Sequence, residues 1–160
     1  KLDSLKAMRP KYSTRNGRIV YGGGGITPDI YIPYSSKISN SVQKILGHSK
    51  RPIFNWASSY TAKYKSNENF ENYKSFKGNW TLPAEHYLDF LRYLETESIK
   101  VDTAYTDEET ALLSLRIKAE IAGVVWGRNE AVGVRLLGDS QVQEGIKYFD
   151  EASVFISHSF

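Results

Sequence analysis

The chain has 160 residues, of which 41% are hydrophobic and 24% charged, and it contains no cysteine. These values fit a soluble globular protein, either one domain or a small domain with a fragment of another. The lack of cysteine excludes disulfides, cysteine nucleophiles and thiolate metal sites. No run approaches the roughly 18 apolar residues of a membrane-spanning helix.

The net charge of +3 hides an uneven distribution along the chain. Residues 1–80 hold 14 Lys and Arg against 4 Asp and Glu, a net charge of +10, and residues 81–160 have a net charge of −7. A basic half rich in tyrosine could bind nucleic acid, but no nucleic-acid motif accompanies it. We therefore expect a solvated basic face, or one that complements the acidic half, and no nucleic-acid partner.

Residues 1–13 have no clean period and are expected to form an extended or disordered tail. The first ten residues lack the apolar middle of a signal peptide and an initiator methionine. This start suits a piece of a longer protein.

Four consecutive glycines, residues 22–25, separate two β-rich triplets, Ile19–Tyr21 and Ile30–Ile32. Because only glycine enters positive φ without steric cost, the pattern predicts a strand, a tight glycine loop and a second strand. Pro28 and Pro33 suit the two ends of that second strand. The run lacks the lysine and hydroxyl residue of a phosphate loop, so it indicates a close backbone approach within a sheet.

The segment from residue 17 to residue 30 reads GRIVYGGGGITPDI. It closely resembles the segment that closes the protease domain of the carboxyl-terminal processing peptidases, also called tail-specific proteases, particularly the Bacteroidetes-type branch. The resemblance implies a serine peptidase with a serine–lysine dyad, usually with a PDZ domain, that acts outside the cytoplasm. In that family the dyad lies N-terminal to this segment. The resemblance therefore implies that the chain begins after the catalytic residues.

The following residues predict helices separated by short connections. Apolar residues at helical spacing and terminal Gly or Pro signals delimit most of them. Residues 65–81 are expected to form a packed loop with a helical turn. The predicted helices are 41–46, 52–64, 83–98 with a stripe of Tyr87, Leu88, Leu91 and Leu94, 107–126, 129–137, and a last one from 139 onward.

The helix over 107–126 has the clearest signals. Thr106 and Glu109 form a capping box in which each side chain accepts from the other residue's amide. The helix is apolar nearly all round toward its C-terminal end and stops at Gly127, as is typical of the middle of a bundle. The predicted fold is mainly α: a helical bundle-like domain over 36–160, preceded over 1–35 by a short β segment from the end of a protease core.

Two Ser–Lys pairs at four-residue spacing, Ser59–Lys63 and Ser114–Lys118, mimic a catalytic dyad. A nucleophilic serine also needs an oxyanion hole and access to substrate, and nothing nearby supplies them. Neither pair matches the dyad context of the family. We predict no catalytic residue in this chain.

The remaining candidate residues also favour structural roles. The histidines are scattered without metal-site spacing, so neither a metal nor a cofactor is predicted. An acidic trio in the first turn of a helix is expected to complement its dipole, Asp29 to cap a turn, and the tryptophans to anchor the core. These residues are His48, His86, His158, the trio Asp107, Glu108 and Glu109, and Trp56, Trp80 and Trp126.

Besides a basic nucleic-acid-binding helical domain, two functional hypotheses follow from the sequence. In the first, the chain is the non-catalytic C-terminal portion of a serine endopeptidase, and its partners are the protease core, the PDZ domain and protein or peptide substrates. An extracytoplasmic place, in the periplasm or envelope, follows from the same resemblance. The alternative is a stand-alone helical interaction or scaffold module. An exposed strand edge within residues 17–33 would favour the first hypothesis.

Overall fold

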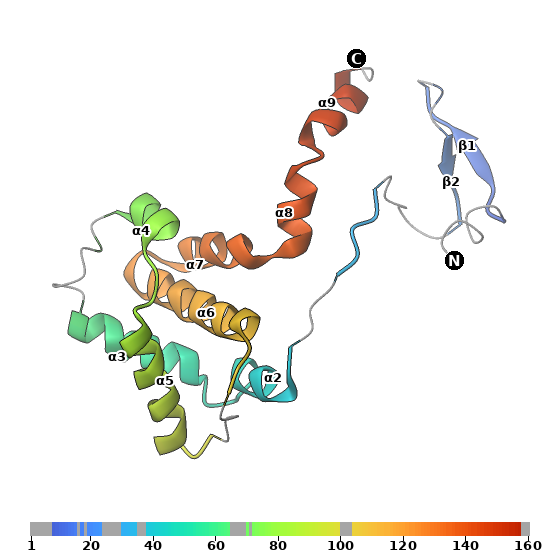
Figure 1. The fold of residues 1–160 in the computed structure, drawn as a ribbon. Coiled ribbons are helices and arrows are strands. Elements are labelled where there is room, and N and C mark those ends of the chain that lie inside the picture. Colours follow the sequence, from blue (N-terminus) through green and yellow to red (C-terminus); the bar gives the residue numbers. More distant parts are fainter. Residues whose placement is uncertain are drawn as a thin grey trace. The chain divides into compact units, whose positions relative to one another are not determined.

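The computed structural model describes residues 8–15, 17, 19–23, 30–34, 38–64, 70, 72–99 and 104–157, and only the backbone of 154–157. The fold is mainly helical with a short two-stranded sheet, as the sequence predicted (Figure 1). The elements are β1 (Lys11–Ser13), β2 (Ile19–Tyr21), α2 (Asn40–Leu46), α3 (Pro52–Tyr64), α4 (Tyr73–Asn79), α5 (Ala84–Thr96), α6 (Asp107–Val125), α7 (Arg128–Arg135), η1 (Leu136–Gly138), α8 (Ser140–Ile146) and α9 (Phe149–Ser157).

The chain divides into two compact units. One unit comprises Lys1–Tyr34 together with Glu144–Phe160, and the other comprises Ser35–Gln143. The second unit, called the helical unit below, contains α2 to α7. No helix in the described ranges is both long enough and apolar enough to cross a bilayer.

Helix α6 is the centre of the helical unit and packs against α3 and α7 (Figure 1). Leu113, Ile117 and Ile121 recur along one stripe of α6 and are fully buried. Burying such a side chain contributes about 1.5–3 kcal/mol. The central place predicted for this helix is confirmed.

Local signals set the ends of α6. The Thr106 hydroxyl accepts from the Glu109 amide at 3.2 Å, and the Glu109 carboxylate accepts from the Thr106 amide at 3.2 Å. Gly127, with a φ of +123°, ends the helix in a conformation that favours glycine. The predicted capping box and stop are confirmed.

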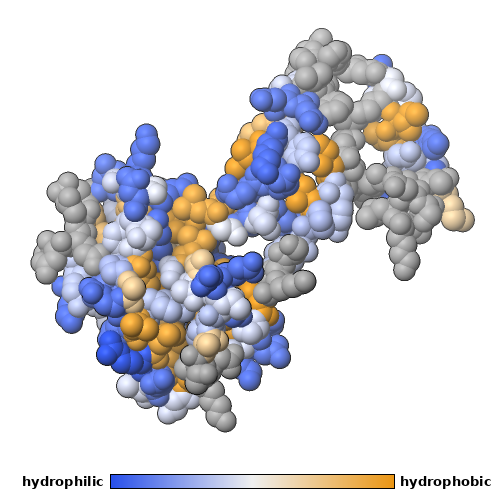
Figure 2. Space-filling model, in the orientation of Figure 1, coloured by the Kyte–Doolittle hydropathy of each residue, from blue (hydrophilic) through white to orange (hydrophobic). Residues whose placement is uncertain are grey.

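Helix α3 spans the predicted residues, and its buried face contains Ile53, Trp56, Ala57 and Tyr60. The stripe predicted for α5 was wrong in part. Phe90 and Leu94 are its fully buried residues, whereas Leu88 is 56% exposed. Other large apolar residues also reach the surface, and Figure 2 shows hydrophobic areas between hydrophilic ones, as is normal for a folded protein.

Two further helical predictions need correction. The helical turn predicted within the loop at 65–81 is a longer helix, α4, whose start the Asn72 side chain caps by accepting from the Ser75 amide at 3.1 Å. The single helix predicted from 139 onward is interrupted between α8 and α9. There the Lys147 and Tyr148 amides bond three residues back instead of four, which ends α8.

The β segment also differs from its prediction. Ile19–Tyr21 forms a strand, but it pairs antiparallel with Lys11–Ser13, in the segment expected to be a tail. Residues 30–32, predicted to be its partner, are not a strand. Gly17, with a φ of +75°, lies in the connection of the hairpin. Only five residues, 14–18, connect β1 to β2, so pairing these strands has a lower loop-closure cost than pairing β2 with residues 30–32 beyond the glycine run.

Candidate functional site

The glycine run begins where β2 ends. The Gly22 amide donates to the Pro10 carbonyl at 2.8 Å, which extends the hairpin by one pair. A Cβ atom at Gly22 would lie 2.6 Å from a ring carbon of Tyr12, so any other residue there would displace the Tyr12 ring. The close backbone approach predicted for the run is present at this glycine. Gly24, Gly25, Pro28 and Asp29 lie outside the described residues.

The hairpin leaves one edge of β2 open among the residues that the structure describes. Because residues 10 and 22 form a hydrogen-bonded pair, antiparallel alternation turns the peptide groups of Ile19 and Tyr21 away from β1. The Ile19 side chain is 58% exposed, and that of Tyr12 is 60% exposed. An isolated two-stranded sheet is marginally stable in water, so this edge suits pairing with another strand.

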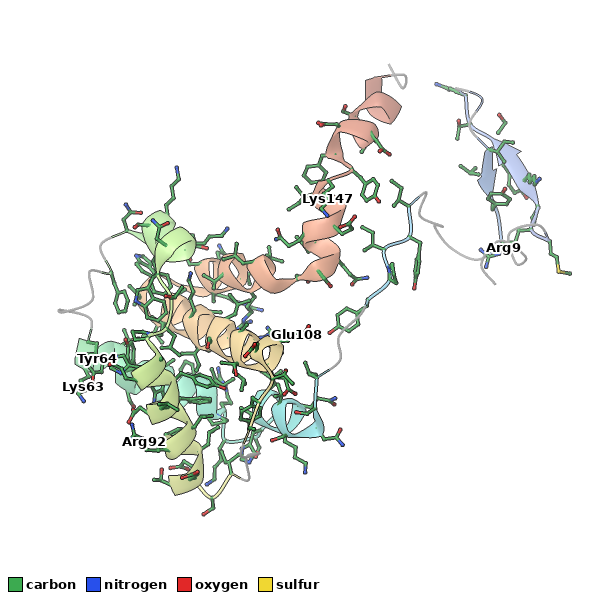
Figure 3. The ribbon with its side chains drawn as sticks, viewed as in Figure 1. Arg9, Lys63, Tyr64, Arg92, Glu108 and Lys147 are labelled. Carbon is green, nitrogen blue, oxygen red and sulfur yellow. The ribbon has the colours of Figure 1, made fainter. Side chains whose placement is uncertain are left out.

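The Ser59–Lys63 pair does not have the features of a dyad. Lys63 lies at the end of α3 beside Tyr64 (Figure 3), with its ammonium 4.9 Å from the centre of the Tyr64 ring. A hydrogen bond to Tyr64 raises the pKa of Lys63. A lysine that acts as a general base needs a lowered pKa, whereas the pKa of Lys63 is raised, so Lys63 is unsuited to that role.

The Ser114–Lys118 pair contains a buried lysine with a structural role. Lys118 Nζ donates to the Lys77 carbonyl at 2.8 Å and to the Trp80 carbonyl at 2.6 Å. Burial lowers the pKa of Lys118. A cation on the last carbonyls of α4 satisfies groups that a helix end leaves without partners. The ammonium therefore joins α6 to α4.

The two histidines that the structure describes, His48 and His86, have separate partners. His48 Nδ1 accepts from the Lys50 amide at 3.2 Å, and His86 packs against the rings of both Tyr60 and Tyr64. His158 lies outside the described residues. In the described ranges, no three His, Asp or Glu side chains are grouped so as to hold a metal ion.

The acidic trio lies in the first turn of α6, and one member has a second role. Glu109 is buried, and one of its oxygens accepts from the Ser39 amide at 2.8 Å. Ser39 itself caps α2, so this carboxylate connects the starts of two helices. Hydrogen bonds from Ser39, and then from Thr106, lower the pKa of Glu109.

The tryptophans pack in aromatic clusters of the core. Trp56 stacks on Tyr60 with ring centres 4.9 Å apart, and its indole N–H donates to Asp89 at 3.4 Å. Trp80 and Trp126 both pack on Phe76. The predicted role as a core anchor is confirmed for Trp56, which is buried, whereas Trp80 and Trp126 are partly buried and pack against the core.

Three arginines that the sequence did not single out line one pocket of about 330 Å³ in the helical unit. Arg51 directly precedes α3, Arg116 lies on α6, and Arg135 is the last residue of α7. Each is separated from the next by 19 residues or more in the sequence, so no local motif could show the group. Only Arg51 lies in the basic first half, whereas Arg116 and Arg135 lie in the acidic second half, so the charge distribution along the sequence did not indicate the group either.

Comparison with known proteins adds one finding. Residues 48–127 match the model of a family described as a family of unknown function (DUF8443). The match covers α3 to α6, the centre of the helical unit, and does not include the β hairpin. No curated protein and no solved structure matches the chain.

Proposed function

The chain belongs to DUF8443, a family of unknown function, so its function has to be inferred from its own residues. We propose that it is the non-catalytic C-terminal portion of a carboxyl-terminal processing serine endopeptidase. In this proposal the serine–lysine dyad precedes Lys1. Serine attacks the scissile carbonyl of a protein or peptide substrate, and lysine serves as general base. The present chain alone is inactive, and the parent protein acts outside the cytoplasm.

The open edge of β2 carries this proposal. It lies within the segment that resembles the end of the peptidase core, and an exposed edge there is expected if neighbouring strands come from the rest of the parent protein. Exposed Ile19 would be covered by the same docking. The helical unit would then be an accessory domain attached to that core.

The first test is the coding sequence upstream of Lys1. A reading frame with a PDZ-like region and a serine–lysine core would support the proposal. A start codon close to Lys1 would refute it and leave the stand-alone interaction module.

A second test uses the intact parent protein and proline substitutions at the hairpin. Ile19→Pro removes an outward amide of β2 while sparing the hydrogen bonds to β1, so it should lower kcat/KM on an unstructured peptide by loosening the core. Ser13→Pro is the matched control, because Ser13 pairs with Ile19 and its amide faces the opposite edge. Equal activity of the Ile19→Pro variant and the wild type would argue against docking through β2.

A further inference from the structure

The arginine pocket lies among α2, α3, α6 and α7, wholly within the helical unit. Apolar and cationic side chains share its lining, and Glu120 is the single acidic group in it. The lining therefore has three positive charges and one negative charge. The apolar part consists of Ile45, Leu46, Pro52, Ile53 and Phe54.

The three guanidinium groups differ in their partners. Arg135 Nη2 donates to Glu120 Oε1 at 2.6 Å, so its charge is balanced. The Arg51 guanidinium stacks 4.3 Å from the centre of the Phe54 ring, which orients the group without neutralising it. Arg116 makes no ion pair or hydrogen bond with any residue that the structure describes. Among the residues that the structure describes, the pocket lining thus has two more positive charges than negative ones.

The backbone beside the pocket is held in an uncommon conformation. Arg51 has a φ of +50°, a region that favours glycine, and it directly precedes a proline. Residues held in sparsely populated backbone regions concentrate at ligand sites. Here the conformation places a cation at the start of α3, where the helix dipole adds to the positive potential.

We propose that this pocket binds a small organic oxyanion, a carboxylate or phosphate on a short apolar body. Guanidinium groups bind both oxyanions through paired, charge-assisted hydrogen bonds. The apolar lining would cover the body of the ligand. The volume equals that of roughly ten water molecules, so a ligand the size of phenylphosphate fits.

Isothermal titration calorimetry of the whole chain at low salt tests the proposal with three probes: phenylphosphate, benzoate and inorganic phosphate. One of the two aryl anions should bind saturably and about tenfold more tightly than inorganic phosphate, because its ring buries apolar surface. The aryl anion that binds better identifies the oxyanion. Amide NMR shifts should concentrate at Ile53 and Phe54 on binding.

Two variants remove cations from the pocket. Arg116→Gln removes the guanidinium that has no ion-pair partner among the described residues, and it should weaken aryl-anion binding about tenfold. Arg51→Gly should weaken binding while preserving the fold, because glycine adopts the φ of +50° readily. Arg128→Gln, at an exposed arginine of α7 outside the pocket, is the matched control and should bind as the wild type does.

Three results would overturn the proposal. They are absent saturable binding of both aryl anions, inorganic phosphate binding as tightly as they do, and unchanged affinity in both pocket variants. If Arg116→Gln fails to fold, Arg51→Gly decides. The inference concerns the helical unit alone, so its failure would leave the peptidase proposal unaffected.

Discussion

At the scale of single residues, Glu109 joins two parts of the fold that are 70 residues apart. Its carboxylate accepts from the amide of Ser39 on one oxygen and from the amide of Thr106 on the other, and protonation would turn one of these acceptors into a hydroxyl. Hydrogen bonding to the charged form stabilises it, and the pKa of Glu109 is lowered accordingly. Stability therefore depends on the ionisation of this one side chain.

A carboxylate with a lowered pKa stabilises the fold above its unfolded pKa of about 4.3, and this contribution is lost as the pH falls through the folded pKa. Urea unfolding should therefore show the wild type more stable than Glu109→Gln at pH 7, with the difference shrinking below about pH 4.3. The neighbouring exposed Glu108→Gln serves as control (Figure 3). A difference that is constant from pH 7 to pH 3 would contradict this role.

At the scale of elements, the helical unit depends on polar groups that connect one helix to another. The short helix α4 contributes one buried residue, Phe76, and its last carbonyls accept from Lys118 of α6. A helix of this length is unstable alone, because isolated helices shorter than about 12 residues are marginal in water. Its contacts with α6 therefore hold it in place.

Replacing Lys118 with methionine keeps most of the side-chain length but leaves two carbonyls without their donor. We expect a loss of about 2 kcal/mol in the free energy of unfolding, because an unsatisfied buried polar group costs about 1–3 kcal/mol. Lys74→Met, at an exposed lysine of the same short helix, should change stability by less than about 0.5 kcal/mol. Chemical denaturation of both variants checks this, and equal stabilities would contradict the connecting role.

At the scale of the whole molecule, one core joins all the helices of the helical unit. Phe90 of α5 is fully buried and meets Trp56 of α3 edge to face at 5.7 Å. All three tryptophans of the chain lie in this unit, so their fluorescence reports its unfolding. Coincident fluorescence and circular dichroism transitions would indicate one cooperative unit.

Phe90→Ala should destabilise the helical unit by about 4 kcal/mol, because it removes apolar contacts and leaves a cavity. Leu88→Ala on the same helix should cost less than about 0.5 kcal/mol, because Leu88 is exposed. Thermal unfolding followed by both signals measures the two changes. Similar losses in the two variants would mean that α5 faces the core differently.

Much of the helical architecture follows from the sequence, because local chemistry sets it. Pro52 opens α3, and the Thr106 capping box and Gly127 delimit α6. These signals act within a few residues, so they can be read along the chain. The dyad-like Ser–Lys spacings were likewise interpreted as chance, and the lysines have other partners in the fold.

Tertiary structure alone decided which residues meet across the chain. It selected Lys11–Ser13 over residues 30–32 as the partner of β2, and Phe90 over Leu88 for the core. It also gathered Arg51, Arg116 and Arg135 around one pocket. Hydrophobic periodicity fixes the face of an element only to within about one residue position, and it contains no information on which distant element that face will meet. The sequence by itself determined the ends of α3 and α6, because their signals are local, whereas the tertiary structure decided which residues form the core and the pocket, because these depend on long-range contacts.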